Sequence, residues 1–176
     1  EDWTWRDEIK AADTVAKKPA VTTPAVTDPA AEAQFEDLID EGNRARDERN
    51  YPAAEAAYKR ARALKAKDSR AVYGLGNLYS DQQRWAEAEA AYREALQMES
   101  GFAITHIALS YVLTQPIPAE NLGDRYDESE RLARRAIQYA PSNALAHDQL
   151  GVAMEMRGII SAETETAYRR AIQLDP

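Results

Sequence analysis

The chain has 176 residues, a formal net charge of −8 and no cysteine. The absence of cysteine excludes disulfides, thiolate zinc sites and a cysteine nucleophile, and the negative charge argues against a general affinity for nucleic acid or anionic lipid. No apolar run approaches the roughly 20 residues that span a bilayer. Because Ala, Glu, Arg and Leu are abundant while Gly, Val and Phe are sparse, we expect an all-α fold.

The first 34 residues differ in composition from the rest of the chain. Trp3, Trp5 and Ile9 lie among charged residues, and a stretch rich in Pro, Thr, Ala and Val follows from Ala16 to Glu32. We expect this stretch to be an extended spacer. Aromatic side chains are costly to leave in water and favoured at interfaces, so the sequence predicts a docking arm with Trp3, Trp5 and Ile9 as its anchors. A disordered tail is the alternative.

The chain begins with Glu1 rather than Met. We therefore expect a processed or truncated product, whose signal peptide or anchor lies outside this sequence. Together with the spacer, this start favours a bacterial protein that is periplasmic, extracellular or envelope-associated over a cytoplasmic one.

Helical patterns interrupted by Asn, Gly, Pro and Asp-Ser clusters run from Phe35 to the C-terminus. The interruptions are too closely spaced for long helices. The sequence predicts eight helices, at residues 35–47, 51–65, 69–82, 85–98, 103–114, 125–139, 144–157 and 161–174.

An internal repeat organises these helices. AEAAYKRARAL at 54–64 aligns with AEAAYREALQM at 88–98, 34 residues later, and the phrase returns as TAYRRAIQLDP at 166–176 and more loosely as RLARRAIQYAP at 131–141. A small residue on the preceding helix, facing Ala on the second, lets two antiparallel helices approach closely. Such a pair cannot bury its faces alone, so the pairs stack. The small residues are Gly42, Gly76, Ser110 and Gly151.

The segment RAVYGLGNLYSDQQRWAEAEAAYREALQM, residues 70–98, resembles a tetratricopeptide repeat. The signature positions hold Leu75, Gly76, Tyr79, Trp85, Ala88, Tyr92 and Ala95. The resemblance implies a right-handed α-solenoid of about four repeats that follows the N-terminal region 1–34. The repeat domain spans 35–176, with repeats at about 35–68, 69–102, 103–143 and 144–176.

Two repeats depart from the family pattern. The third is longer, because TQPIPAENLGDR lies between its helices and its prolines cannot sit inside either one; we expect a protruding loop. The fourth departs around Gly158, Ile159 and Ile160 and is not followed by the polar capping helix that usually ends such arrays. We expect either a truncated chain or a terminal face that another segment covers.

In this family the first helices of the repeats line a concave groove, and the resemblance implies a partner-binding site there. The implied groove residues are Ile39, Asn43, Arg46, Arg70, Tyr73, Asn77, Ser80, Ile104, Ile107, Tyr111, Thr114, Leu145, Asp148 and Val152. Asparagine can bond both N–H and C=O of an extended peptide, while Tyr and aliphatic residues offer apolar pockets. The alternative is that several of these residues only contact the neighbouring helix. The family's chaperone-binding carboxylate clamp is not expected. Asn43 matches one position of the clamp, but Ile39, Gly74, Ile104 and Ala108 stand where other clamp residues would be.

Catalysis is poorly supported by the sequence. No Gly-rich phosphate loop, nucleophile elbow or HExxH motif is present. His106 and His147 occupy equivalent positions in the third and fourth repeats, and no second metal ligand stands three or four residues away on the same helix. We expect both to be packing residues with one hydrogen bond each, in a protein that is not an enzyme and has no metal and no cofactor.

Two functions fit these observations. The first is a protein–protein interaction scaffold or adaptor, whose groove and third-repeat loop hold segments of other proteins within a larger assembly. The alternative is a structural subunit that assembles head-to-tail through its uncapped C-terminal end and its N-terminal arm. An enzyme accessory with a hidden hydrolytic site lacks every site motif. The expected partners are other proteins, peptide segments or further copies of this chain, without nucleic acid or membrane insertion.

Overall fold

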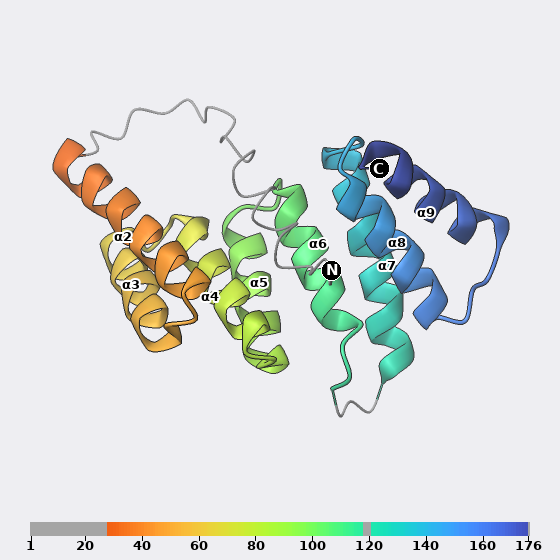
Figure 1. Cartoon of the computed structure of the whole chain (residues 1–176), viewed down its shortest axis with the longest axis horizontal. Coiled ribbons are helices and arrows are strands. Elements are labelled where there is room, and N and C mark those ends of the chain that lie inside the picture. The colour runs from red at the N-terminus through yellow and green to blue at the C-terminus, as the bar shows by residue number, and fades with distance from the viewer. Residues whose placement is uncertain (1–27, 118–120, 176) are drawn as a thin grey trace.

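The structure, a computed structural model, describes residues 28–117 and 121–175. Helices follow one another along an elongated array, with α2 at one end and α9 at the other (Figure 1). This confirms the all-α solenoid that the sequence predicts. The helices of the described part are α2 (Pro29–Asp47), α3 (Tyr51–Leu64), α4 (Ser69–Asp81), α5 (Trp85–Met98), α6 (Ala103–Leu113), α7 (Leu122–Tyr139), α8 (Ala144–Met156) and α9 (Ala162–Leu174).

Helix α2 begins six residues before its predicted start. The side chain of Asp28 caps it by accepting a 3.0 Å hydrogen bond from the amide of Ala30, and Pro29 occupies the first helical position. Proline is favoured there because its fixed φ suits a helix and its missing N–H would have had no partner. The last four residues of the predicted spacer, 29–32, are therefore helical. Helix α7 likewise begins three residues early, at Leu122.

The helices pack as four antiparallel pairs, α2 with α3, α4 with α5, α6 with α7 and α8 with α9, and the second helix of each pair packs on the first helix of the next. Successive first helices α2, α4, α6 and α8 also contact one another, whereas the second helices diverge. The first helices therefore form the inner side of the array. No helix of the described residues combines the length and hydropathy that a membrane span needs.

A tyrosine packed on glycines holds the first two pairs together. Tyr58 and Tyr92 are fully buried. A Cβ atom placed on Gly42 or Gly74 would lie 2.5 Å from the ring of Tyr58, and one on Gly76 would lie 2.5 Å from the ring of Tyr92. These distances are too short for any side chain, so the sequence needs glycine at all three positions.

The third pair is held by hydroxyl groups instead. Ser110 and Ser129 are fully buried, their Oγ atoms lie 2.8 Å apart, and the Oγ of Ser129 donates to the carbonyl of Ser110 at 2.9 Å. Ala133 stands where the aligned repeats carry a tyrosine. Gln149, at the repeat position of Gly74, is 4% exposed. The fourth repeat thus has the larger Gln149 in place of a glycine where the third repeat has the smaller Ala133 in place of a tyrosine.

The first helices of repeats one, two and four end in the same turn. Arg49, Gln83 and Gly158 adopt φ angles of 59°, 58° and 76°. The next amide donates back across the turn in each case, for example from Asn50 to the carbonyl of Ala45 at 2.8 Å. This is the Schellman arrangement, in which a left-handed residue lets the last carbonyls of a helix find donors.

Ion pairs bridge the second helices, which otherwise diverge along the outer side. Arg62 of α3 pairs with Glu94 of α5 at 2.6 Å, and Arg93 of α5 pairs with Glu128 of α7 at 2.6 Å. The third bridge joins Arg134 of α7 to Glu163 of α9 at 2.8 Å. Side-chain contacts of this kind repeat from one pair of helices to the next.

Candidate functional site

A cavity of about 470 Å³ opens on the inner side of the array between α2, α4 and α6. We call it the groove cavity. Six of the predicted groove residues line it: Ile39, Asn43, Arg70, Tyr73, Asn77 and Ile104. The remaining lining residues are Glu32, Glu36, Asp68, Ser69, Gly74, Glu99, Phe102 and Thr105.

The apolar part of the cavity comes from three helices and one turn. Ile39 of α2, Tyr73 of α4 and Phe102, which precedes α6, are partly buried, and Ile104 is 9% exposed. The ring of Tyr73 lies 5.8 Å from that of Tyr92 in the core. These side chains are therefore held by packing while part of their surface stays open to a ligand.

Two asparagines give the cavity polar groups of defined orientation. The hydroxyl of Tyr58 donates to Oδ1 of Asn43 at 2.7 Å, and the hydroxyl of Tyr92 donates to Oδ1 of Asn77 at 2.6 Å. Because each oxygen already accepts one hydrogen bond, each amide offers chiefly its N–H donors to a ligand. The tyrosines that hold the helix pairs together thus also orient the amides of the site.

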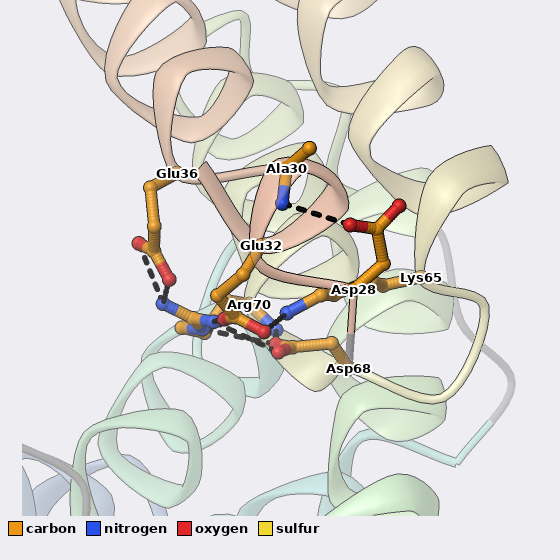
Figure 2. A network of polar contacts seen from close by, with 7 residues as sticks. All are labelled: Asp28, Ala30, Glu32, Glu36, Lys65, Asp68 and Arg70. Carbon is orange, nitrogen blue, oxygen red and sulfur yellow. Dashed lines mark hydrogen bonds and ion pairs between the residues drawn. The ribbon is translucent and has the colours of Figure 1, made fainter. Parts of the chain in front are cut away.

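Arg70 lies at the centre of an ionic cluster on one edge of the cavity (Figure 2). Its Nε and Nη2 donate to the two oxygens of Asp68 at 3.0 and 2.9 Å, while Nη1 donates to the two oxygens of Glu36 at 2.8 and 2.9 Å. Asp68 also caps α4 by accepting from the amide of Arg70 at 3.1 Å. One guanidinium therefore ties the N-terminal half of α2 to the start of α4.

The same edge contains a second cation, Lys65, which pairs with Glu32. Lys65 Nζ and Arg70 Cζ each lie 4.7 Å from the centre of the buried ring of Phe35. The hydrogen bond from Lys65 lowers the pKa of Glu32, and the hydrogen bonds to Asp68 are the main reason that the pKa of Arg70 rises above its usual range. Both groups therefore stay charged near neutral pH.

Carboxylates outnumber cations among the described residues around the cavity. Glu32, Glu36, Asp68 and Glu99 line it together with the guanidinium of Arg70. In the part of the chain that the structure describes, the hydrogen-bond partner of Glu99 is the hydroxyl of Ser69, at 3.3 Å. Glu99 thus keeps a negative charge with which no cation of this part of the chain pairs.

Several predicted groove residues lie beneath the inner surface. Ile107 is 0% exposed and Arg46 6%, and Arg46 pairs with Asp81 at 3.8 Å. Both side chains therefore lie in the wall of the groove, beneath its surface. Ser80 and Thr114 are also buried, and Thr114 Oγ1 already donates to the carbonyl of Tyr111 at 2.7 Å.

The other predicted residues lie further along the inner side. Tyr111 packs against Trp85 with ring centres 6.1 Å apart, and burial raises its pKa. Leu145 and Val152 are partly exposed on α8. Asp148 is an exposed residue, but the protein around its carboxyl group displaces part of the solvent and so raises its pKa. The negative charge of Glu155 raises the pKa further, by a smaller amount. None of the four lines the groove cavity. The predicted arm residues Trp3, Trp5 and Ile9 lie outside the described residues.

His106 occupies a packing position, whereas His147 is partly exposed. His106 is 2% exposed, its Nδ1 lies 2.9 Å from the carbonyl of Phe102, and its ring centre lies 5.4 Å from that of Tyr139. Burial lowers its pKa. His147 Nε2 lies 3.0 Å from the carbonyl of Pro141. Among the described residues, no cluster of three or more His, Cys, Asp or Glu side chains has a geometry that could hold a metal ion.

Sequence reasoning missed the acidic part of the site. Glu32 and Glu36 belong to the first turns of α2, and Glu32 was assigned to the spacer. The Asp28-Pro29 pair, a helix start signal, could have placed both on the first helix. Glu99 and Phe102 come from the connection before α6, and nothing in their sequence pattern indicates that it reaches the groove.

The sequence model described as Tetratricopeptide repeat matches residues 39–101, which contain both tyrosine–glycine pairs of the first two repeats. This segment of the chain belongs to the tetratricopeptide repeat family. Repeats of this kind generally mediate protein–protein interaction, through the extended concave surface that stacked pairs create. No curated protein sequence matches the chain.

Solved structures share the tetratricopeptide fold. A thermophilic tetratricopeptide protein of Thermus thermophilus is 17% identical with a TM-score of 0.69, over 80% of this chain and 74% of that one. PilF of Pseudomonas aeruginosa is 17% identical with a TM-score of 0.71, over 83% of this chain and 63% of PilF. At such identities the likeness shows a common fold alone.

A mutant O-GlcNAc transferase of Thermobaculum terrenum also contains a similar array. It is 22% identical with a TM-score of 0.61 over 76% of this chain. This chain spans only 23% of the transferase. Most tetratricopeptide repeat proteins are non-catalytic scaffolds, and the transferase activity belongs to a much longer protein.

Proposed function

We propose that this tetratricopeptide repeat protein is a scaffold or adaptor that holds an extended segment of another protein in the groove cavity. The observation that supports this function is the cavity itself, which combines open apolar side chains with two amides of fixed orientation across three repeats. Ligand sites generally pair an apolar lining with a few well-placed polar groups.

An extended segment suits the arrangement of the asparagines. Asn43 and Asn77 are 34 residues apart and occupy the same position in consecutive repeats. Their N–H groups can donate to carbonyls of a peptide backbone that crosses α2 and α4, while alternate side chains enter the apolar part beside Ile39 and Tyr73. Backbone contacts then give affinity, and the side-chain pockets give specificity.

The test is selection of peptides from a random dodecapeptide display library on the full chain, followed by NMR of the complex. Binding should shift the side-chain amide signals of Asn43 and Asn77. Ile39→Ala should weaken the selected peptides about tenfold, because an anchor side chain loses its apolar contact. Ile172→Ala is the matched control, since Ile172 is 65% exposed on α9, outside the cavity. Peptides that respond equally to both variants would contradict the proposal.

A head-to-tail structural subunit is the second candidate. It is favoured by exposed apolar residues at the C-terminal end, where Ile160 is 90% and Ile172 65% exposed. At the other end, α2 presents exposed Asp37, Asp40 and Glu41 where α4 has buried Ala71, Gly74 and Leu75. Light scattering across a concentration series tests assembly. Growth in mass that Ile172→Asp or a Trp3→Ala/Trp5→Ala double variant abolishes would support this candidate over the adaptor.

A further inference from the structure

The charges around the groove cavity indicate which kind of segment it accepts. We propose that the cavity selects a peptide segment of a partner protein in which a lysine or arginine stands next to a large apolar residue. This inference rests on the adaptor function proposed above and gives its partner a chemistry. In the complex, the cation lies beside Glu99 and Glu36, and the apolar side chain lies against Ile39, Tyr73 and Ile104.

The first reason is that the cations of the site are already engaged. Arg70 donates to both oxygens of Asp68 and both oxygens of Glu36, at distances between 2.8 and 3.0 Å. Lys65 pairs with Glu32. An acidic peptide would have to displace these carboxylates before it could reach a cation. Charge-assisted pairs of this geometry are the stronger hydrogen bonds of proteins, so the exchange gains little.

The second reason is that negative charge remains available. Glu99 has the neutral hydroxyl of Ser69 as its partner among the described residues, and Glu36 shares its cation with Asp68. A lysine or arginine of the ligand supplies the missing counter-charge. An acidic segment, in contrast, would bring its own carboxylates close to those of Glu36 and Glu99. Repulsion between like charges at an interface disfavours such a partner strongly.

The third reason is the position of the apolar side chains. Phe102 and Ile104 follow Glu99 within five residues of chain, in the connection before α6 and in its first turn. All three line the same cavity as Ile39 and Tyr73. A cation at Glu99 therefore places a neighbouring side chain of the same peptide within reach of the apolar lining. This adjacency is what requires a basic residue beside an apolar one.

The experiment applies the random dodecapeptide library to the wild-type chain and to a Glu36→Gln/Glu99→Gln double variant. Glutamine keeps the shape of each side chain and the acceptor for Ser69, but removes the charge. The wild-type chain should enrich peptides with Lys or Arg beside Leu, Ile, Phe or Met. The double variant should keep the apolar preference, lose the basic one, and bind the best wild-type peptide about fivefold more weakly.

The matched control is Glu87→Gln/Glu165→Gln, which removes two exposed charges on α5 and α9 outside the cavity. It should bind like the wild type. Circular dichroism verifies that all variants fold. Equal losses in the cavity variant and in this control would overturn the inference, because they would reflect the total charge of the protein rather than the cavity.

The other outcomes separate the inference from the function beneath it. Peptides that depend on Ile39 but lack basic residues would overturn the basic specificity and leave the adaptor function standing. Peptides that do not depend on Ile39, or no enrichment at all, would overturn both. Binding that appears only after Trp5→Ala and Ile9→Ala would mean that the chain's own N-terminal segment, which contains Trp5-Arg6 and Ile9-Lys10, occupies the groove in place of a partner.

Discussion

The second and third repeats bring equivalent helices together through different chemistry. In the second, the ring of Tyr92 packs on Gly76, and its hydroxyl orients Asn77 in the groove. In the third, Ser110 and Ser129 join α6 to α7 by mutual hydrogen bonds, and the tyrosine is absent. The groove cavity extends over α2, α4 and α6, but its oriented asparagines come only from repeats with the aromatic pair. Between these two repeats, core chemistry and groove chemistry therefore change together.

The largest effect in this comparison is expected from Tyr92→Ala. Removing a fully buried aromatic side chain should lower the free energy of unfolding by about 4 kcal/mol, and Asn77 loses its hydroxyl partner. Urea denaturation followed by circular dichroism measures the change. Tyr92→Phe, which removes only the hydroxyl, should cost about 1 kcal/mol. Equal losses for both variants would mean that the ring contributes little.

The next effect is a test of the close approach itself. Gly76→Ala places a Cβ 2.5 Å from the ring of Tyr92 and should destabilise the protein by about 2 kcal/mol, although alanine is the better helix former. Combined with Tyr92→Ala, the same substitution should cost much less, since the ring it meets is gone. Additive losses in the urea midpoint of the double variant would contradict the steric explanation.

The serine pair should behave as a coupled unit. Ser110→Ala leaves the buried groups of Ser129 with fewer partners and should cost about 1.5 kcal/mol, as should Ser129→Ala. The double variant should lose less than the sum, because no hydroxyl is then buried without its partner. A double-mutant cycle in urea measures this coupling. A coupling of zero would show that the two hydroxyl groups act independently.

A smaller effect concerns the turns. Gly158→Ala should destabilise the fourth repeat by about 1 kcal/mol, because its φ of 76° is unfavourable for a residue with a Cβ. The opposite substitution, Gln83→Gly at a φ of 58°, should stabilise the second repeat by a few tenths of a kcal/mol, roughly. Thermal unfolding of both variants checks the signs. A loss of stability in Gln83→Gly would mean that the side chain of Gln83 makes compensating contacts.

The smallest effect near neutral pH comes from His106, which occupies the position of Val72 one repeat earlier. Burial lowers its pKa below the usual value of 6.5. Above that pH the ring is neutral in both states and contributes no pH dependence. As the pH falls below it, the unfolded chain binds a proton first, so folding stability decreases. His106→Val should remove this decrease between pH 7 and 5.5. Urea midpoints of the wild type and the variant at both pH values measure the effect. An NMR titration of His106 in the wild type checks that its pKa is lowered.

The fold could be predicted because each repeat carries the same core residues at fixed spacing. Tyr58 and Tyr92 with their glycines specify both the helices and their pairing. The start of α2 was missed because Pro29 was treated as part of a spacer, although proline also begins helices. The serine pair was anticipated only as a small residue at position 110, since nothing on the first helix indicates that Ser129 supplies the partner hydroxyl.

The site could be predicted where it is built from repeat positions. Asn43, Tyr73 and Asn77 follow from the family pattern and line the cavity. Ile107 occupies the repeat position of Tyr73 but does not line the cavity, because it is buried in a cluster with Ala136 and Ala146. The carboxylate of Glu99 reaches the cavity from a connection between helices. Its location depends on how successive pairs are stacked, which a single repeat does not encode.

The arginine–glutamate bridges between α3, α5, α7 and α9 have a mechanical consequence. Packed side chains resist bending on the inner side, whereas the outer side is spanned by long, partly exposed side chains whose attraction is weakened by salt. High salt should therefore weaken the contacts along the outer side of the solenoid more than the apolar packing along its inner side.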